Sequence, residues 1–483
     1  MRRVLVIGLS ILVVLCGLGA ASVVWFWQSL AQDTTGKVDF VRSLAVPPLA
    51  PSRVDGQGRR VFDLTAAAGR HDFGRGGVAT WGFNGAYLGP TLRAKRGEQV
   101  VVNVHNGLSE ATTVHWHGMH LPAEMDGGPL TMVAAGQTWS PTWRVNQPAA
   151  TLWYHPHPHG STADQTYRGL AGMFLIDDPD TDVAALPHEY GVDDVPVIVQ
   201  DKLLRGDRLG KGSGFGGMGT LGDTIVVNGT AAPYLDVTTD RVRLRLLNGS
   251  NARVYDFGFA DDREYALVGT DGGLLAAPVP TRRVMLSPGE RADIVVAVRA
   301  GERVVLRSTP PALKSGVIGD RFAGGADRFD VLELRAAATL RATEPVPATL
   351  VDVPRLDRAD AVRTRDFALS GNTINGQGMS MSRVDARVVK GTTEIWRVRN
   401  TDGLPHTFHV HDVRFQVLTV GGQPPPPALG GWKDTIYLRG NVTYEIIMTF
   451  HEYADPNHAY MFHCHVLTHE DQGMMGQFVV VDQ

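Results

Sequence analysis

The fold class is decided by the stretch Arg241-Val242-Arg243-Leu244-Arg245-Leu246-Leu247, in which charged and apolar side chains alternate along most of its length. A period of two is the pattern of a β-strand that buries one face. Similar short β-branched runs occur at 99–104, 195–199 and 477–481, and Gly, Pro, Asn and Asp lie between them. We find no amphipathic helical pattern that competes with these runs. Closely spaced short strands separated by turn residues predict an all-β protein built from sandwiches or barrels.

Length and composition limit the class of protein further. A chain of 483 residues is too long for one hydrophobic core. Its 43% apolar and 20% charged residues are typical of a globular protein. The net charge of −4 predicts no nucleic-acid partner. Only two cysteines are present, Cys16 and Cys464, so a disulfide framework is excluded.

The distribution of strand sequence predicts three β domains. Strand sequence is interrupted at 177–194 and again at 336–366, which places the domains at 59–180, 190–340 and 365–483, after a polar linker at 31–58. Asn84-Gly85, Asn228-Gly229 and Asn375-Gly376 each open a similar passage, as three copies of one module would. The alternative is that Asn-Gly is simply a common hairpin turn.

The N-terminus, residues 1–30, is expected to be a signal or a membrane anchor. Residues 4–27 are almost uninterruptedly apolar and follow Arg2 and Arg3. Such a run is long enough to cross a bilayer as a helix, and the arginines predict a cytoplasmic N-terminus. We favour an uncleaved anchor over a cleaved signal peptide. Either alternative predicts an exported protein, at the periplasmic or extracellular face of the membrane.

Four short histidine clusters carry the chemistry. On a strand, residues i and i+2 point to the same face, so each His-x-His pair presents two neighbouring imidazoles. Imidazole nitrogen suits copper, zinc, iron and nickel. Two clusters lie in the N-terminal third and two in the C-terminal third, which predicts a group of metal ions between the first and last domains. The paired histidines are His115, His117, His155, His157, His409, His411, His463 and His465.

Cys464 predicts a second metal site beside the first. It lies between His463 and His465, so on a strand its side chain would face the opposite way. His406, His469 and Met474 can complete its coordination. Two histidines, one cysteine and a weak axial methionine form the ligand set of a blue-copper electron-transfer centre. His120 and His159 lie beside clusters but break the pairing, and we expect them in an outer shell or at the surface.

With these motifs the chain resembles the three-domain multicopper oxidases, the group that includes laccases, bilirubin oxidase and the bacterial copper-efflux oxidase. The resemblance extends from about residue 60 to the C-terminus. It implies cupredoxin-like Greek-key β-sandwich domains and four copper ions: one type 1, one type 2 and two type 3. Besides the histidine clusters, the matching motifs are Asp126-Gly127-Gly128, Leu246-Leu247-Asn248-Gly249, Gly431-Trp432-Lys433-Asp434-Thr435 and His469-Glu470-Asp471.

The resemblance also implies how the ligands are divided. Asp126 and Glu470 match acidic residues that relay protons to oxygen in the family; the alternative is that they order a turn and a loop. The type 1 copper would take His406, Cys464, His469 and axial Met474; the type 2 copper His115 and His409; one type 3 copper His117, His155 and His465; and the other His157, His411 and His463.

The implied activity is the one-electron oxidation of four donor equivalents, coupled to the four-electron reduction of O₂ to water. Phenols and aromatic amines are the expected donors, with Cu(I) as the alternative. Residues 310–365 contain no methionine where the copper-efflux type has a methionine-rich insert, although Asp402, Met379 and Met381 remain as candidates for Cu(I). A copper-free structural relative that supports cell division is disfavoured by the intact ligand set. We expect a monomer.

Overall fold

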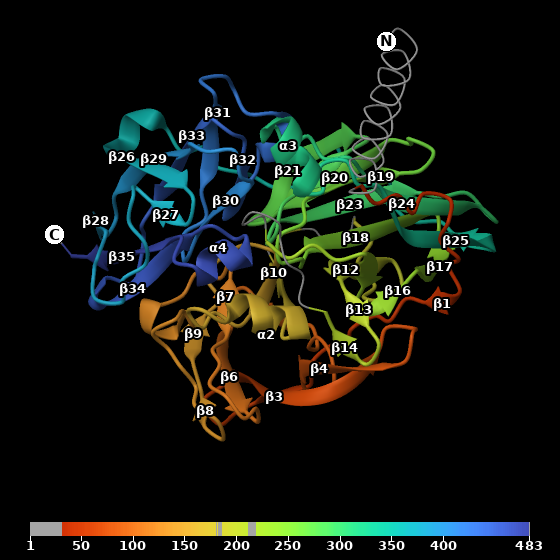
Figure 1. Ribbon diagram of the computed structural model, residues 1–483, viewed down its shortest axis with the longest axis horizontal. Helices are drawn as coiled ribbons and strands as arrows, with labels where there is room; N and C mark the ends of the chain where they lie inside the picture. Colours follow the sequence, from red (N-terminus) through yellow and green to blue (C-terminus); the bar gives the residue numbers. More distant parts are fainter. Residues whose placement is uncertain (1–30, 180, 182–185, 211–218, 483) are drawn as a thin grey trace, which may run out of the picture.

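The computed structural model describes residues 31–179, 181, 186–210 and 219–482, and β-strands dominate it (Figure 1). The all-β prediction is confirmed. The helix expected over residues 4–27 lies outside the described residues. Within the described part of the chain, no helix has the length and apolar character needed to cross a membrane.

Two sheets enclose a hydrophobic cluster whose buried members come from the sequence range Phe62 to Ile176. Leu64 and Val102 reach it from one sheet, and Leu152 and Phe174 from the other. The short helices η1 (Ala123–Met125) and α2 (Thr162–Arg168) follow histidine-bearing strands. One sheet has the order β5 (Leu92–Lys95), β11 (Gly172–Asp177), β10 (Ala150–His155), β7 (His115–His117). The other has the order β2 (Ser52–Val54), β3 (Arg60–Asp72), β6 (Gln99–Asn106), β8 (Thr138–Trp139), with β4 (Gly77–Phe83) on β3 and β9 (Thr142–Arg144) on β6.

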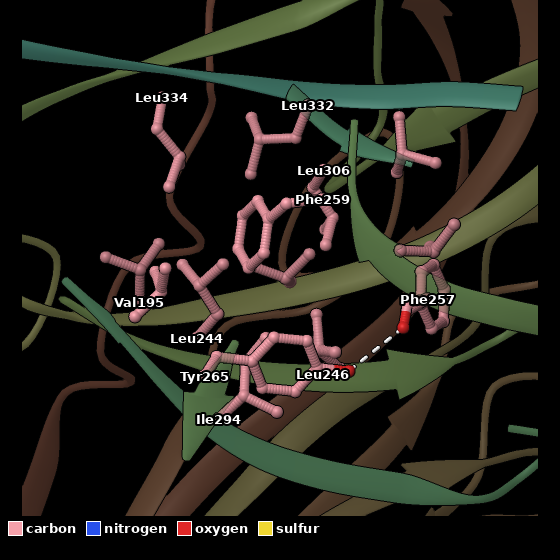
Figure 2. Close-up of a cluster of buried hydrophobic side chains, with 14 of the residues drawn as sticks. Val195, Leu244, Leu246, Phe257, Phe259, Tyr265, Ile294, Leu306, Leu332 and Leu334 are labelled. Carbon is pink, nitrogen blue, oxygen red and sulfur yellow. Dashed lines mark hydrogen bonds between the residues drawn. The ribbon is translucent and has the colours of Figure 1, made fainter. Parts of the chain in front are cut away.

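A second pair of sheets encloses the cluster drawn in Figure 2, where Leu244 and Ile294 of one sheet lie opposite Phe259 and Leu332 of the other. Helix α3 (Gly316–Phe322) and the hairpin of β13 (Leu204–Arg205) and β14 (Arg208–Leu209) lie outside these sheets. The first sheet has the order β16 (Thr230–Ala231), β15 (Thr224–Val227), β12 (Asp194–Lys202), β18 (Arg241–Asn248), β23 (Arg291–Ala297), β20 (Tyr265–Thr270), β21 (Gly273–Thr281). The second has the order β1 (Arg42–Ser43), β17 (Pro233–Thr239), β25 (Phe329–Arg341), β24 (Arg303–Thr309), β19 (Tyr255–Phe259), β22 (Val284–Leu286).

A third pair of sheets encloses a cluster around Trp396, Phe408 and Phe462. The helices of this region are η4 (Arg358–Asp360), η5 (Pro427–Leu429) and α4 (Leu467–Asp471). One sheet has the order β27 (Thr373–Ile374), β26 (Ala361–Ser370), β29 (Thr393–Asn400), β33 (Thr443–Thr449), β31 (Gln416–Val420). The other has the order β28 (Ala386–Val389), β35 (Met475–Val481), β34 (Asp455–His463), β30 (His406–Val410), β32 (Thr435–Leu438).

Strand β18 is buried more completely than its alternating sequence predicts, because it is buried on both faces. Its Leu244 and Leu246 enter the core. Its Arg243 and Arg245 pair with Asp293 and Asp194 and are at most 6% exposed. Arg245 also donates to Thr151 Oγ1 of β10, at 2.8 Å. The charged face of this strand is therefore an internal ion-pair layer against β10, rather than a solvated surface.

The segment expected to be a linker, residues 31–58, is instead built into the sheets. Strand β1 pairs with β17 and β2 pairs with β3. Leu44 belongs to the second hydrophobic cluster, and Phe40 is also buried. These apolar side chains give the otherwise polar, proline-rich segment a buried anchor. The proposed domain limits at 59–180, 190–340 and 365–483 stay a prediction.

Candidate metal centre

Paired strands bring the eight paired histidines together. Strands β7 and β10 run antiparallel with His115 opposite His155, and β30 meets β34 with His409 opposite His463. All eight side chains are at most 1% exposed: His115, His117, His155, His157, His409, His411, His463 and His465. Strand register therefore converts four separate sequence clusters into one buried group of imidazoles.

The ring nitrogens lie within reach of shared ions. His463 Nε2 is 3.1 Å from both His157 Nε2 and His411 Nε2. His117 Nδ1 lies 3.3 Å from His155 Nε2. The His465 ring is near this second pair, with its centroid 5.0 Å from that of His117 and 5.3 Å from that of His155.

The other nitrogens of several rings are anchored, and this fixes which nitrogen is free to bind. A carbonyl oxygen only accepts, so the nitrogen that contacts it donates and the opposite nitrogen keeps its lone pair. His115 Nε2 and His409 Nε2 are buried and have no hydrogen-bond partner among the described residues. Such orientation by an outer partner is typical of metal-binding histidines. The anchored Nδ1 atoms are those of His115 on Asp126 O (3.0 Å), His155 on Pro156 O (2.8 Å), His409 on Asp434 O (2.8 Å) and His463 on Cys464 O (3.1 Å).

Burial keeps most of these imidazoles neutral, which is the form that binds a metal. It lowers the pKa of His157 and of His465 to about 3, with neighbouring histidines adding to the shift. The pKa values of His117, His155, His409 and His411 are lowered well below the ordinary value for the same two reasons. In His463, burial also lowers the pKa, but Glu470 outweighs it and the pKa is raised.

Asp126 and Glu470 both contact the histidine group. Asp126 Oδ2 lies 2.7 Å from His411 Nδ1, and Oδ1 lies 3.3 Å from His115 Nδ1. Glu470 Oε1 lies 3.3 Å from His157 Nδ1, and Oε2 lies 3.1 Å from His463 Nδ1. Burial raises the pKa of Glu470, but His157 and His463 outweigh burial and hold it below its usual range. Each carboxylate therefore bridges two imidazoles on the side away from the free nitrogens.

Asp434 and Arg291 were not predicted as site residues. Asp434 Oδ1 lies 3.0 Å from His117 Nε2, which leaves His117 Nδ1 directed toward His155. Arg291 of β23 binds both carboxylate oxygens of Asp434, at 2.7 and 2.5 Å. The Gly431–Thr435 motif contained Asp434, but nothing in its spacing indicated this contact.

Cys464 lies on the other side of the chain from the eight-histidine group. Its Sγ is 3.8 Å from His406 Nδ1 and 3.6 Å from His469 Nδ1, and these two nitrogens are 3.2 Å apart. Burial raises the pKa of the Cys464 thiol, but hydrogen bonds from His406 and His469 outweigh it and the pKa falls well below its usual value. Thr407 N–H also donates to the sulfur, at 3.4 Å. The surroundings favour a thiolate, the form that binds metals.

The chain around Cys464 is less regular than predicted. Strand β34 ends at His463, and α4 begins at Leu467, so Cys464 and His465 lie in the connecting loop. The side chains still alternate in direction. Met474 is fully buried, its N–H donates to His469 O at 2.9 Å, and its carbonyl accepts from Cys464 N–H at 3.1 Å. The return of the chain at α4 therefore places the backbone of Met474 beside that of Cys464.

Two further histidines stay outside these groups, as expected. His159 is exposed. His120 pairs with Asp412, 2.6 Å away, and contacts neither group.

The three residues considered for Cu(I) lie in different surroundings. Asp402 Oδ1 lies 3.0 Å from His406 Nε2, Met379 N–H donates to Gly473 O, and Met381 is exposed.

The fold consists of paired sheets around separate hydrophobic cores. It holds one site with a thiolate and two imidazoles, and a second site of buried imidazoles. These features together define a copper protein of the cupredoxin class. Comparison with known proteins agrees. The multicopper oxidase family models match residues 67–181 and 346–483. The chain belongs to the multicopper oxidase family.

Its relatives include two differently named groups. The cell division protein FtsP of Sodalis glossinidius is 37% identical over 461 residues, covering 91% of this chain and 93% of the relative. The multicopper oxidase mco of Staphylococcus haemolyticus is 34% identical over 444 residues, 90% of this chain and 92% of the relative.

Solved structures of similar fold include bacterial oxidases. A laccase-like multicopper oxidase of Ochrobactrum, described as oxidising lignin model compounds and lignosulfonate, has a TM-score of 0.83 and 36% identity over 91% of this chain and 100% of its own. A laccase of Pediococcus acidilactici has a TM-score of 0.84 and 33% identity over 93% and 96%.

Proposed function

We propose that this protein is a laccase-like oxidase, which takes single electrons from phenols or aromatic amines and reduces O₂ to water. The observation that carries the proposal is that Cys464 belongs to one group of ligands while its sequence neighbours His463 and His465 belong to the other. The peptide chain itself therefore connects an electron-accepting site to an oxygen-reducing site. Four copper ions would supply the chemistry, because together they can store the four electrons that one O₂ requires.

The proposed ligand roles are those that the family resemblance implies. His406, Cys464, His469 and Met474 would hold the type 1 ion. His115 and His409, whose Nε2 atoms are unpartnered, would hold the type 2 ion. His157, His411 and His463, whose ligand atoms lie close together, would hold one type 3 ion. His117, His155 and His465, whose ring centroids are at most 5.5 Å apart, would hold the other.

Asp126 and Glu470 would relay protons for oxygen reduction. Both carboxylates are buried and each contacts two histidines of the group. Because the pKa of Glu470 lies below its usual range, this residue is ionised near neutral pH, and its role would be to accept a proton and pass it on. Glu470 connects His157 of the first histidine region with His463 of the last.

An organic donor is supported by the relatives and by the sequence. The Ochrobactrum and Pediococcus structures are described as a laccase-like oxidase and a laccase, and residues 310–365 contain no methionine. Cu(I) oxidation is the alternative, because the Asp402 carboxylate contacts His406 of the proposed type 1 site. The expected monomeric state, export and membrane anchoring through residues 4–27 are parts of the same proposal.

The FtsP relatives favour a second candidate, a non-enzymatic role in cell division. A protein with that role alone has no need for a thiolate and eight buried imidazoles converging on two sites. The two candidates therefore differ in one measurable property, copper-dependent oxygen consumption.

The decisive experiment measures bound copper and oxygen uptake, with a phenol and with Cu(I) as donors under matched conditions. We expect full copper loading and faster uptake with the phenol. Cys464→Ser should abolish blue absorption and turnover, because the thiolate ligand is lost. His157→Ala should lose copper, whereas His159→Ala, an exposed histidine two residues away, should retain it. Full loading without uptake from either donor would contradict the oxidase proposal.

The proton role of Glu470 has its own test. Glu470→Gln keeps the shape of the side chain but removes the group that accepts the proton, and loss of an acid–base group costs about 10²–10⁴-fold in rate. We expect slower oxygen reduction and an altered pH profile at unchanged copper content. Glu124→Gln, which changes an exposed carboxylate, serves as the control. Unchanged turnover in Glu470→Gln would remove the relay role.

A further inference from the structure

A cavity of about 660 Å³ lies where several distant segments of the chain meet, and none of the clustered histidines lines it. Its wall combines Pro148 and Ala149 before β10, Leu274 of β21, the segment 349–354, and Arg414 with Trp432. A cavity of this volume is large enough to enclose a small organic molecule.

Arg414 is the unusual group in this wall. Its guanidinium stacks on the Trp432 indole, 4.3 Å from the ring centroid. Its Nη1 is buried without a hydrogen-bond partner, and no carboxylate lies within ion-pair distance of it among the described residues. A buried donor without a partner costs free energy.

The neighbouring charges do not compensate this cation. Burial lowers the pKa of Arg414 to about 10, and the nearby Arg96 adds to this shift. Arg414 also contributes to the lowered pKa of His451, whereas Asp412 and Glu452 outweigh its effect on His120, whose pKa is raised. Arg96 has its own partner in Asp178, at 3.2 Å.

Two acids also line the cavity, but neither pairs with Arg414. Asp178 is held by Arg96, and Asp352 is exposed to solvent. The apolar side chains of Leu274, Leu350 and Val351 complete the lining. The cavity thus offers one uncompensated guanidinium and an apolar wall, a combination that suits a carboxylate attached to an apolar body.

We propose that this cavity is a binding site for a small organic carboxylate, with the carboxylate on Arg414 and the apolar part against Leu274 and Leu350. The site is separate from the copper ligands. Trp432 connects it to them through the chain, because Asp434, two residues further on, contacts His117.

Titration calorimetry of the copper-loaded protein tests the site, with benzoate as the probe and acetate and inorganic phosphate as comparisons. We expect one benzoate site that is weakened about 10–100-fold in Arg414→Gln, the loss that a charged hydrogen bond carries. Arg303→Gln, a change at an arginine that is 68% exposed, should leave the affinity unchanged. Acetate, which lacks the apolar body, should bind more weakly than benzoate.

Arg414→Lys is the control for a folding defect, because it keeps the positive charge but lacks the planar guanidinium that binds a carboxylate through two hydrogen bonds. It should show an intermediate affinity at an unchanged unfolding temperature. Equal benzoate affinity in Arg414→Gln and the unmodified chain would overturn the proposal, as would no benzoate binding at all. Phosphate binding as tightly as benzoate at Arg414 would overturn the assigned ligand class.

Discussion

Single hydrogen bonds decide which nitrogen each buried histidine turns toward its neighbours. His115 and His409 donate Nδ1–H to backbone carbonyls and so leave Nε2 free, whereas His117 donates Nε2–H to Asp434 and leaves Nδ1 free. Nothing in a His-x-His spacing distinguishes these cases. The ligating atom of each histidine is thus a property of its outer partner, and Asp434 is the partner that sequence reasoning missed.

Asp434→Asn tests that role. The amide still accepts a hydrogen bond, but it is less basic than the carboxylate and removes the carboxylate nearest to Arg291. Loss of an outer partner of a ligand typically costs about 10–100-fold in metal affinity. We expect that weakening in a chelator competition for copper. Asp236→Asn, at an exposed position, should have no effect, and equal affinities in both variants would contradict the role of Asp434.

At the scale of elements, a tight turn after η1 places Asp126. Gly127 has φ of +77°, and a Cβ on it would lie 1.8 Å from Val114 O. The backbone thus passes so close to the residue before β7 that only glycine fits. This approach brings the carbonyl and carboxylate of Asp126 to His115 and His411.

Gly127→Ala should therefore lower stability and disturb copper binding. A left-handed conformation costs a non-glycine residue roughly 1–2 kcal/mol, and the clash with Val114 adds to it. Gly136→Ala is the matched control, because Gly136 has φ of +75° and nothing within 4 Å of its Cβ. Thermal unfolding should show a clearly larger loss for Gly127→Ala. Equal losses would mean that the close approach is unimportant.

Across the whole molecule, buried ion pairs join the sheets that carry the site. Asp293 of β23 accepts from Thr151 Oγ1 of β10 at 2.8 Å and pairs with Arg243. Burial raises the pKa of Asp293, but Arg243 and Arg245 outweigh it, so its pKa lies below the usual value. Arg291 and Asp434 make a second connection of this kind, between β23 and the residue before β32.

The buried ion pairs of Asp293 predict that the folding stability of the protein depends on pH. The pKa of Asp293 is lower in the folded than in the unfolded protein. Its contribution to folding stability is therefore fully present above the unfolded pKa of about 3.9 and is lost as the pH falls through the folded pKa. Asp293→Asn should cost about 3–5 kcal/mol near neutral pH and flatten the fall in stability at acid pH. Denaturant unfolding at several pH values measures both. Asp366→Asn, in an exposed pair with Arg397, should cost at most about 1 kcal/mol.

Local sequence patterns were sufficient to predict the all-β class and the family resemblance, because strand alternation and His-x-His spacing are properties of short stretches of chain. They also named the eight histidines and Cys464 that the structure brings together. Tertiary structure alone decided the burial of both faces of β18, the incorporation of residues 31–58 into sheets, and the contact of Asp434 with His117. These depend on residues far apart in sequence, such as Arg245 with Thr151 and Arg291 with Asp434, whose proximity no local pattern encodes.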